Sequence, residues 1–252
     1  MAAHDTGART GVILAAGFGS RLRGVSDTTE LKPLTPVGGV PLLVRAIDSL
    51  ALAGCVKVVI VVGHGAADVE GSLRAVYTGD TPIVFALNER FDLANGVSVL
   101  AAKPHLVGDE FVLMMADHVV GTEVMDLVRD YVLPDRCATL LVDLKLDTIF
   151  DMDDATKVYV EDDKIVRIGK MITGYNSVDC GIFVCSTALM DAIERVYVAT
   201  GDASLSDGVQ AFSADGRMLT LDVGDGFWQD VDTPEMLAHA EAVLAASGVS
   251  RL

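Results

Sequence analysis

"TGVILAAGFGSRLRG", at residues 10–24, is an apolar run that gives way to glycines and arginines. A short apolar run of this kind is typical of a strand buried on both faces of a parallel sheet. Gly17 and Gly19 then let backbone N–H groups approach phosphate oxygens closely. The stretch therefore predicts an α/β fold with a phosphate-binding loop after its first strand.

Strand and helix patterns alternate along the next hundred residues. The pattern predicts helices over 41–54, 66–77 and 96–106, and apolar strands over 57–63, 82–87 and 110–118. This alternation indicates a Rossmann-like, mainly parallel mixed sheet sandwiched by helices. Ligands of such sheets bind beyond the carboxyl ends of the strands, where both Gly17 and Asp117 fall.

The second half of the chain is richer in strands. We expect a strand over 138–146, a hairpin over 157–169 that turns at Asp162-Asp163, and a strand over 178–185. Helices follow over 187–198 and 204–213, and the chain closes with a strand over 228–231 and a helix capped by Thr233. Since no linker separates the halves, residues 1–252 are expected to form one domain with a small β-rich elaboration.

Composition and charge exclude several classes of protein. The chain has 252 residues, 51% of them hydrophobic, and a formal charge of −17. Such an acidic surface repels nucleic acid and anionic membranes, so we expect neither as a partner. No apolar run is long enough to span a bilayer, and the four cysteines have neither zinc nor redox spacing. We expect a soluble, cytoplasmic protein with reduced, buried thiols.

The glycine spacing rules out two common nucleotide motifs. The dinucleotide fingerprint fails because Leu22 stands at its third glycine, and the P-loop fails because Val25 follows Gly24. What remains is Gly-x-Gly-x-Arg followed by Lys32, which suits a triphosphate whose charge must be neutralised while one bond breaks. The alternative is a mobile surface loop with ordinary exposed charges.

Several segments together resemble a known enzyme superfamily. "LAAGFGSRLRG" and "LKPLTPVGGVPLL" resemble the signature of the sugar-phosphate nucleotidyltransferases. The segments "NGVSVLAAK", "FVLMMADHVV", "DATKVYVEDDKIVRIGK", "SVDCGIFV" and "WQDVDTPE" resemble one branch in particular, the CTP:inositol-1-phosphate cytidylyltransferases. The resemblance implies a nucleotide-binding part, about 10–137 with 217–252, and an acceptor-binding part, about 138–216.

The resemblance also implies roles for residues of the nucleotide-binding part. Arg21 and Lys32 would act catalytically on the triphosphate. The residues implied to hold the nucleotide are Leu14, Ala15, Ala16, Gly17, Gly19, Asn95 and Gly96. Arg23 is equally consistent with a solvated surface residue, and Leu31 departs from the family, which often has proline there.

A magnesium site is implied at the end of the predicted strand over 110–118. Asp117 ends an apolar strand, where a lone carboxylate is costly, and the resemblance makes it a Mg²⁺ ligand. The family's Trp-x-Asp pattern selects Asp230 as the second ligand, with Asp232 as the alternative. For His118 we expect a hydrogen bond to a backbone carbonyl.

The acceptor side rests on Lys170, Asp179 and Thr156. By resemblance, Lys170 grips the acceptor phosphate. An acidic residue such as Asp179 can bind acceptor hydroxyls, and Thr156 is a further candidate for acceptor binding. The implied reaction joins CTP to inositol 1-phosphate. GTP, UTP or ATP with another cyclitol or hexose 1-phosphate, and a regulatory nucleotide-binding subunit without catalysis, stay open. The sequence is compatible with a homo-oligomer.

Overall fold

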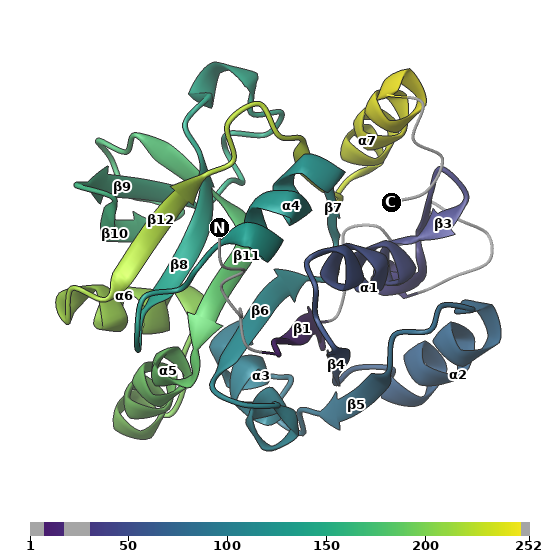
Figure 1. The fold of residues 1–252 in the computed structure, drawn as a ribbon, viewed down its shortest axis with the longest axis horizontal. Coiled ribbons are helices and arrows are strands. Elements are labelled where there is room, and N and C mark those ends of the chain that lie inside the picture. Colours follow the sequence, from purple (N-terminus) through teal and green to yellow (C-terminus); the bar gives the residue numbers. More distant parts are fainter. Residues whose placement is uncertain (1–7, 18–30, 248–252) are drawn as a thin grey trace, which may run out of the picture.

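A nine-stranded sheet forms the centre of the molecule (Figure 1). The computed structural model describes residues 8–17 and 31–247. The strands run in the order β5-β4-β1-β6-β11-β8-β12-β10-β9. Their bounds are β1 Thr10–Ala15, β4 Lys57–Val62, β5 Ile83–Leu87, β6 Glu110–Met115, β8 Ala138–Asp143, β9 Lys157–Glu161, β10 Lys164–Gly169, β11 Ser177–Ser186 and β12 Met218–Asp222.

The first half of the sheet is parallel, as its sequence predicts. Strand β1 lies between β4 and β6, and β4 pairs with β5, all in parallel. All six β1 residues are buried, because Val12 and Leu14 face one core while Ile13 and Ala15 face the other. Burial on both faces explains the unbroken apolar run that opens the chain.

The second half of the sheet is mixed, so the prediction of a mainly parallel sheet is correct only for β5-β4-β1-β6 and for the pair β8–β12. Strand β11 pairs antiparallel with β6, β8 and β9. Its pairing with β9 closes β11, β8, β12, β10 and β9 into a small barrel-like sheet. The predicted hairpin turn is present, with Asp162 and Asp163 at φ values of 49° and 59°. Strand β12 lies between β8 and β10, inside this β-rich half.

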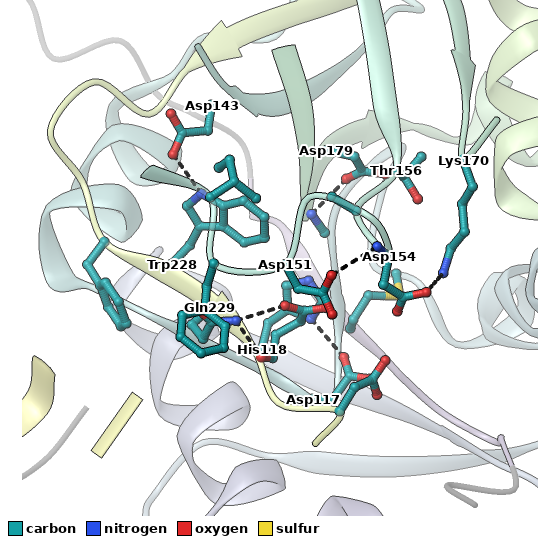
Figure 2. A pocket seen from close by; sticks show the side chains of 18 of the residues that line it. Asp117, His118, Asp143, Asp151, Asp154, Thr156, Lys170, Asp179, Trp228 and Gln229 are labelled. Carbon is teal, nitrogen blue, oxygen red and sulfur yellow. Dashed lines mark hydrogen bonds and ion pairs between the residues drawn. The ribbon is translucent and has the colours of Figure 1, made fainter. Parts of the chain in front are cut away.

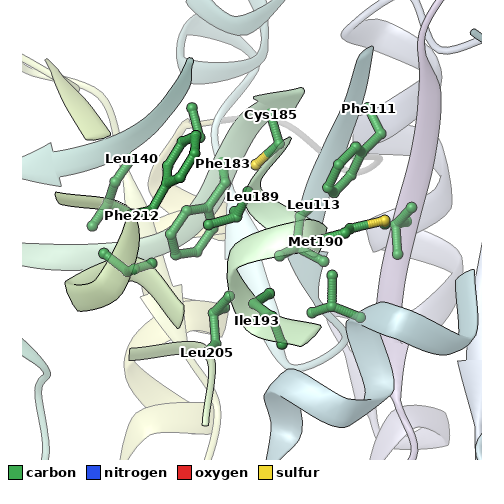
Figure 3. Close-up of a cluster of buried hydrophobic side chains, with 14 of the residues drawn as sticks. Phe111, Leu113, Leu140, Phe183, Cys185, Leu189, Met190, Ile193, Leu205 and Phe212 are labelled. Atoms are coloured by element: carbon green, nitrogen blue, oxygen red, sulfur yellow. The ribbon is translucent and has the colours of Figure 1, made fainter. Parts of the chain in front are cut away.

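Helices cover both faces, as expected of a sandwich. One core joins the sheet to α3 (Asn95–Ala102), α5 (Thr187–Thr200) and α6 (Leu205–Ala214). Figure 3 shows this core, where Phe183 and Phe212 meet side chains of α5. The other core joins the sheet to α1 (Leu42–Leu52), α2 (Ala66–Val76) and α4 (Thr122–Asp130). Ring and aliphatic packing of this kind supplies most of the stability.

A short two-stranded ribbon brings together two acidic segments that are distant in sequence. Strand β7 (His118–Val120) pairs antiparallel with β13 (Trp228–Asp230), which sets Asp230 opposite His118. The backbone N–H of Val231 donates to the carbonyl of Asp117 at 2.9 Å. Helix α7 (Pro234–Ser247) follows, and Thr233 Oγ1 accepts from Met236 N at 3.3 Å, as the predicted cap requires.

The cysteines and the helix lengths bear on two expectations from composition. All four cysteines are free thiols; Cys55, Cys180 and Cys185 are buried, while Cys137 is half-buried. Burial raises the pKa of Cys55 to about 12, although nearby Arg9 opposes this. Within residues 8–17 and 31–247, no helix combines the length and the apolar character needed to cross a membrane.

Candidate active site

A cavity of about 520 Å³ opens beside the β7–β13 ribbon (Figure 2). Its wall combines the end of β6, the segment after β8, the middle of β11 and strand β13. Of the predicted site residues, those lining it are Asn95, Asp117, Thr156, Lys170, Asp179 and Asp230. The fold thus gathers residues of both predicted parts of the chain around one space.

Lys32 lies between two carboxylates at one edge of this cavity. It begins a short 3-10 helix (Lys32–Leu34), and its ammonium donates to both Asp117 and Asp232. Burial works to lower the pKa of Lys32, but the attraction and hydrogen bonds of the two carboxylates outweigh it and raise the pKa. Lys32 is therefore a fixed cation at the carboxyl end of β6.

His118 takes a different partner from the one predicted. Its Nδ1 lies 2.7 Å from Asp117 Oδ1, so it is held by a carboxylate and not by a backbone carbonyl. Burial works to lower the pKa of His118, but the hydrogen bond and charge of Asp117, with Asp230 and Asp179, raise it. In turn Lys32 and His118 hold the pKa of Asp117 below its usual range, against the effect of burial. The Asp117 carboxylate is therefore ionised and doubly paired.

Asp232 also belongs to a group of three carboxylates that suits a divalent cation. Ligand oxygens of Asp154, Asp230 and Asp232 lie within 4.8 Å of one another, and all three residues are half-buried. Burial, together with the charges of Asp117 and Asp232, raises the pKa of Asp230 against the attraction of His118. A cation among these oxygens would relieve their repulsion, and Mg²⁺ prefers oxygen ligands. The donor set therefore fits Mg²⁺.

The three predicted acceptor residues lie on one side of the cavity (Figure 2). Lys170 Nζ donates to Asp154 Oδ1 at 2.7 Å, so the predicted phosphate-binding lysine already faces an anion. The carbonyl of Thr156 accepts from Asp179 N at 2.9 Å, and Asp179 Oδ1 accepts from Gly181 N at 2.7 Å. These bonds tie Thr156 and Asp179 to an irregularity of β11 at Gly181, whose φ of +71° suits glycine.

Asp179 gives a stability prediction that depends on pH. Burial raises its pKa from the usual 3.8 to about 6, although the Gly181 N–H and His118 oppose this. The folded state thus binds the proton more tightly than the unfolded state does, so protonated Asp179 stabilises the fold below about pH 4. This stabilisation is lost as the pH rises through 6. We expect the difference in unfolding free energy between Asp179→Asn and wild type to shift in favour of the variant by roughly 1–3 kcal/mol when the pH is raised from 4 to 8. Urea unfolding of both proteins at the two pH values measures this, and an equal difference at both would contradict it.

In the described part of the predicted nucleotide loop, only backbone groups are available to contact a nucleotide, because the side chains are buried or absent. Leu14, Ala15 and Ala16 are buried with their side chains in the two cores. Gly17 is exposed, and a Cβ there would meet no described atom within 4 Å, so packing does not demand glycine. Gly19, Arg21 and Arg23 lie outside the described residues, and their roles stay predictions.

Asn95 and Gly96 begin α3 and contact the segment that leads into α6. Asn95 Oδ1 accepts from Leu205 N at 2.9 Å. A Cβ on Gly96 would lie 2.6 Å from the carbonyl oxygen of Ala203, so close packing of two backbones requires glycine here. The structure therefore gives Gly96 a packing role, while its predicted contact with the nucleotide stays a prediction.

Comparison with known proteins identifies the family. The model of the MobA-like NTP transferase domain matches residues 11–145, which is more than half of the chain. The chain belongs to the MobA-like NTP transferase family. The match covers the described parts of β1, the segment at Lys32 and the end of β6 at Asp117, and it confirms the resemblance to nucleotidyltransferases.

Individual proteins are similar to this transferase over nearly its whole chain. A bifunctional IPC transferase and DIPP synthase of Rubrobacter xylanophilus is 35% identical over 98% of the chain, and 56% of that relative is covered. A relative of the same description from Archaeoglobus fulgidus is 31% identical over 94% of the chain and 44% of its own length. The chain thus spans about half the length of these relatives. The solved inositol-1-phosphate CTP transferase from T. maritima is 26% identical, with a TM-score of 0.79 over 93% of this chain and 96% of that one.

Two residues of the transferase site, Asp154 and Asp143, are not predicted from the sequence. Asp154 joins the carboxylate group, and Asp143 bonds both Lys145 and the Trp228 indole. Each lies at or after the end of β8, among several aspartates in "DLKLDTIFDMDDAT", which offers no periodicity to single one out. One sequence pattern could have indicated Asp143 as a site residue: like Asp117, it lies at the end of an apolar strand.

Proposed function

We propose that this transferase joins CTP to inositol 1-phosphate in a Mg²⁺-dependent reaction that yields CDP-inositol and pyrophosphate. The observation that carries the nucleotidyl transfer is Lys32, held between Asp117 and Asp232 at the edge of a cavity lined by Lys170. The substrate pair follows the similarity to the T. maritima inositol-1-phosphate CTP transferase, whose length the chain covers almost completely.

The chemistry needs no general base from the protein. A phosphate monoester has a second pKa of about 6, so the acceptor phosphate is largely dianionic at neutral pH. One of its oxygens attacks the α-phosphorus of CTP, and the bond to the β-phosphate breaks with release of pyrophosphate. The work of the protein is to bring two polyanions together and to stabilise the charge of the transition state.

Named side chains divide this work. Lys32 and Arg21 stabilise charge on the triphosphate, and Lys170 holds the acceptor phosphate. Asp117 and Asp230, with Asp154 and Asp232 nearby, would hold Mg²⁺. When bound, Mg²⁺ supplies charge neutralisation for the phosphate oxygens. Several aspartates line the cavity and repel the phosphates of the substrates, so each cation that faces a phosphate is important for substrate binding.

A substrate panel tests the proposal. Pyrophosphate release is measured with CTP, GTP, UTP and ATP, each paired with inositol 1-phosphate, glucose 1-phosphate or no acceptor. We expect release with CTP and inositol 1-phosphate at a kcat/KM at least about tenfold above every other pair. Release with GTP and not CTP would contradict the choice of base. Nucleotide binding without release for any acceptor would favour a regulatory subunit.

A further inference from the structure

Asp143 is a buried carboxylate that serves two cavity residues at once. Its side chain is 4% exposed. Oδ1 accepts from Lys145 N at 2.7 Å and from Lys145 Nζ at 2.9 Å, while Oδ2 accepts from Trp228 Nε1 at 2.9 Å. With both oxygens occupied and almost no exposed surface, Asp143 cannot itself be a major contact of a substrate.

Lys145 is the residue through which Asp143 reaches the cavity. Its side chain is 36% exposed and lines the cavity. Of the three N–H bonds of its ammonium, one points to Asp143 and one to the carbonyl oxygen of Gly224, which leaves the third for a ligand. Two fixed bonds give this ammonium a defined direction, as a specific hydrogen bond requires.

Trp228 forms the neighbouring part of the same wall. Its indole is fixed at Nε1 by Asp143, and its ring is stacked at 15° to His118 with centroids 6.1 Å apart. Figure 2 shows Asp143 and Trp228 across the cavity from Lys170 and Asp154. An acceptor whose phosphate lies at Lys170 would therefore extend its other end toward Trp228 and Lys145.

We propose that Asp143 is a positioning residue that aims the Lys145 ammonium at a hydroxyl group of the acceptor ring. Lys145 then distinguishes a polyhydroxylated acceptor from a plain phosphate ester. This inference rests on the proposed function, because it takes the acceptor phosphate to lie at Lys170.

The test compares two acceptors that share a phosphate and differ in hydroxyl groups, inositol 1-phosphate and cyclohexyl phosphate. We expect Lys145→Met to lower kcat/KM for inositol 1-phosphate roughly 10- to 100-fold, mainly through KM, since a hydrogen bond to a charged donor is lost. For cyclohexyl phosphate the same variant should stay within about threefold of wild type, because no hydroxyl is present. Lys164→Met, which removes an exposed lysine of β10, is the matched control and should change neither value.

The positioning role has its own spectroscopic readout. Trp228 is the single tryptophan of the chain, so intrinsic fluorescence reports on it alone. We expect Asp143→Asn to shift the emission maximum of Trp228. The same variant should lower the ratio of kcat/KM for inositol 1-phosphate to kcat/KM for cyclohexyl phosphate. Lys145→Met should lower the same ratio and keep the emission maximum, since the bond from Asp143 to the indole remains.

Two results would overturn the inference, and they are distinguishable from a failure of the proposed function. Equal loss for both acceptors in Lys145→Met, or no loss for either, contradicts the inference alone while wild-type turnover stands. No pyrophosphate release by wild type with inositol 1-phosphate contradicts the proposed function, and the inference falls with it.

Discussion

Lys32→Met should lower kcat with CTP and inositol 1-phosphate about 1,000-fold, because it removes a fixed cation from the triphosphate without shortening the side chain. Lys32 is held by Asp117 and Asp232, so its charge is in place before the substrates arrive. A preorganised cation of this kind stabilises developing charge without reorganisation in the transition state. Steady-state pyrophosphate release at saturating substrates measures the loss.

The variant also leaves two carboxylates facing each other, so folding must be controlled. Removing one member of a buried ion pair costs about 3–5 kcal/mol of stability, which could unfold a marginal protein. Lys32→Arg keeps the charge and should retain the fold with part of the activity. Circular dichroism of both variants separates folding from catalysis. A folded Lys32→Met protein with kcat within about fivefold of wild type would contradict the catalytic role.

Asp117→Ala should abolish turnover and leave the fold intact. We expect kcat to fall by roughly three to four orders of magnitude, since the cation that neutralises the phosphate oxygens would lose a ligand. Lys32 keeps its bond to Asp232, which preserves a partner for the buried ammonium.

His118 gives this variant a readout other than activity. Asp117 raises the pKa of His118 by hydrogen bond and charge, so in Asp117→Ala the pKa of His118 should fall. Titration of the histidine resonances by NMR measures the shift. Turnover within about tenfold of wild type, with the His118 pKa lowered as expected, would exclude Asp117 from the metal site.

The first half of the fold follows from sequence because each element carries its own signal. Strand β1 is apolar at every position since both its faces are buried, and α1 ends just before Gly54, whose φ of 80° suits glycine. Asp117 could be selected because a carboxylate at the end of an apolar strand needs a partner. These are local patterns of burial and backbone, which a single sequence records directly.

The second half depends on pairings between distant residues, which periodicity does not record. Strand β12 inserts between β8 and β10, and β9 returns to β11, although no residue type marks either pairing. The same holds for the site: Asp143 meets Trp228, and Asp154 meets Asp230, across long stretches of sequence. The prediction of a backbone partner for His118 is wrong, because the approach of Asp117 to its ring depends on side-chain geometry and not on spacing.

In the proposed reaction, an acceptor phosphate oxygen attacks the α-phosphorus of CTP. The most direct measurement uses inositol 1-phosphate labelled with ¹⁸O on its phosphate, incubated with CTP, Mg²⁺ and the wild-type protein, with mass spectrometry of both products. We expect CDP-inositol that retains all of the label and pyrophosphate that carries none. Label in pyrophosphate or in free phosphate, or the absence of CDP-inositol, would contradict the proposed reaction.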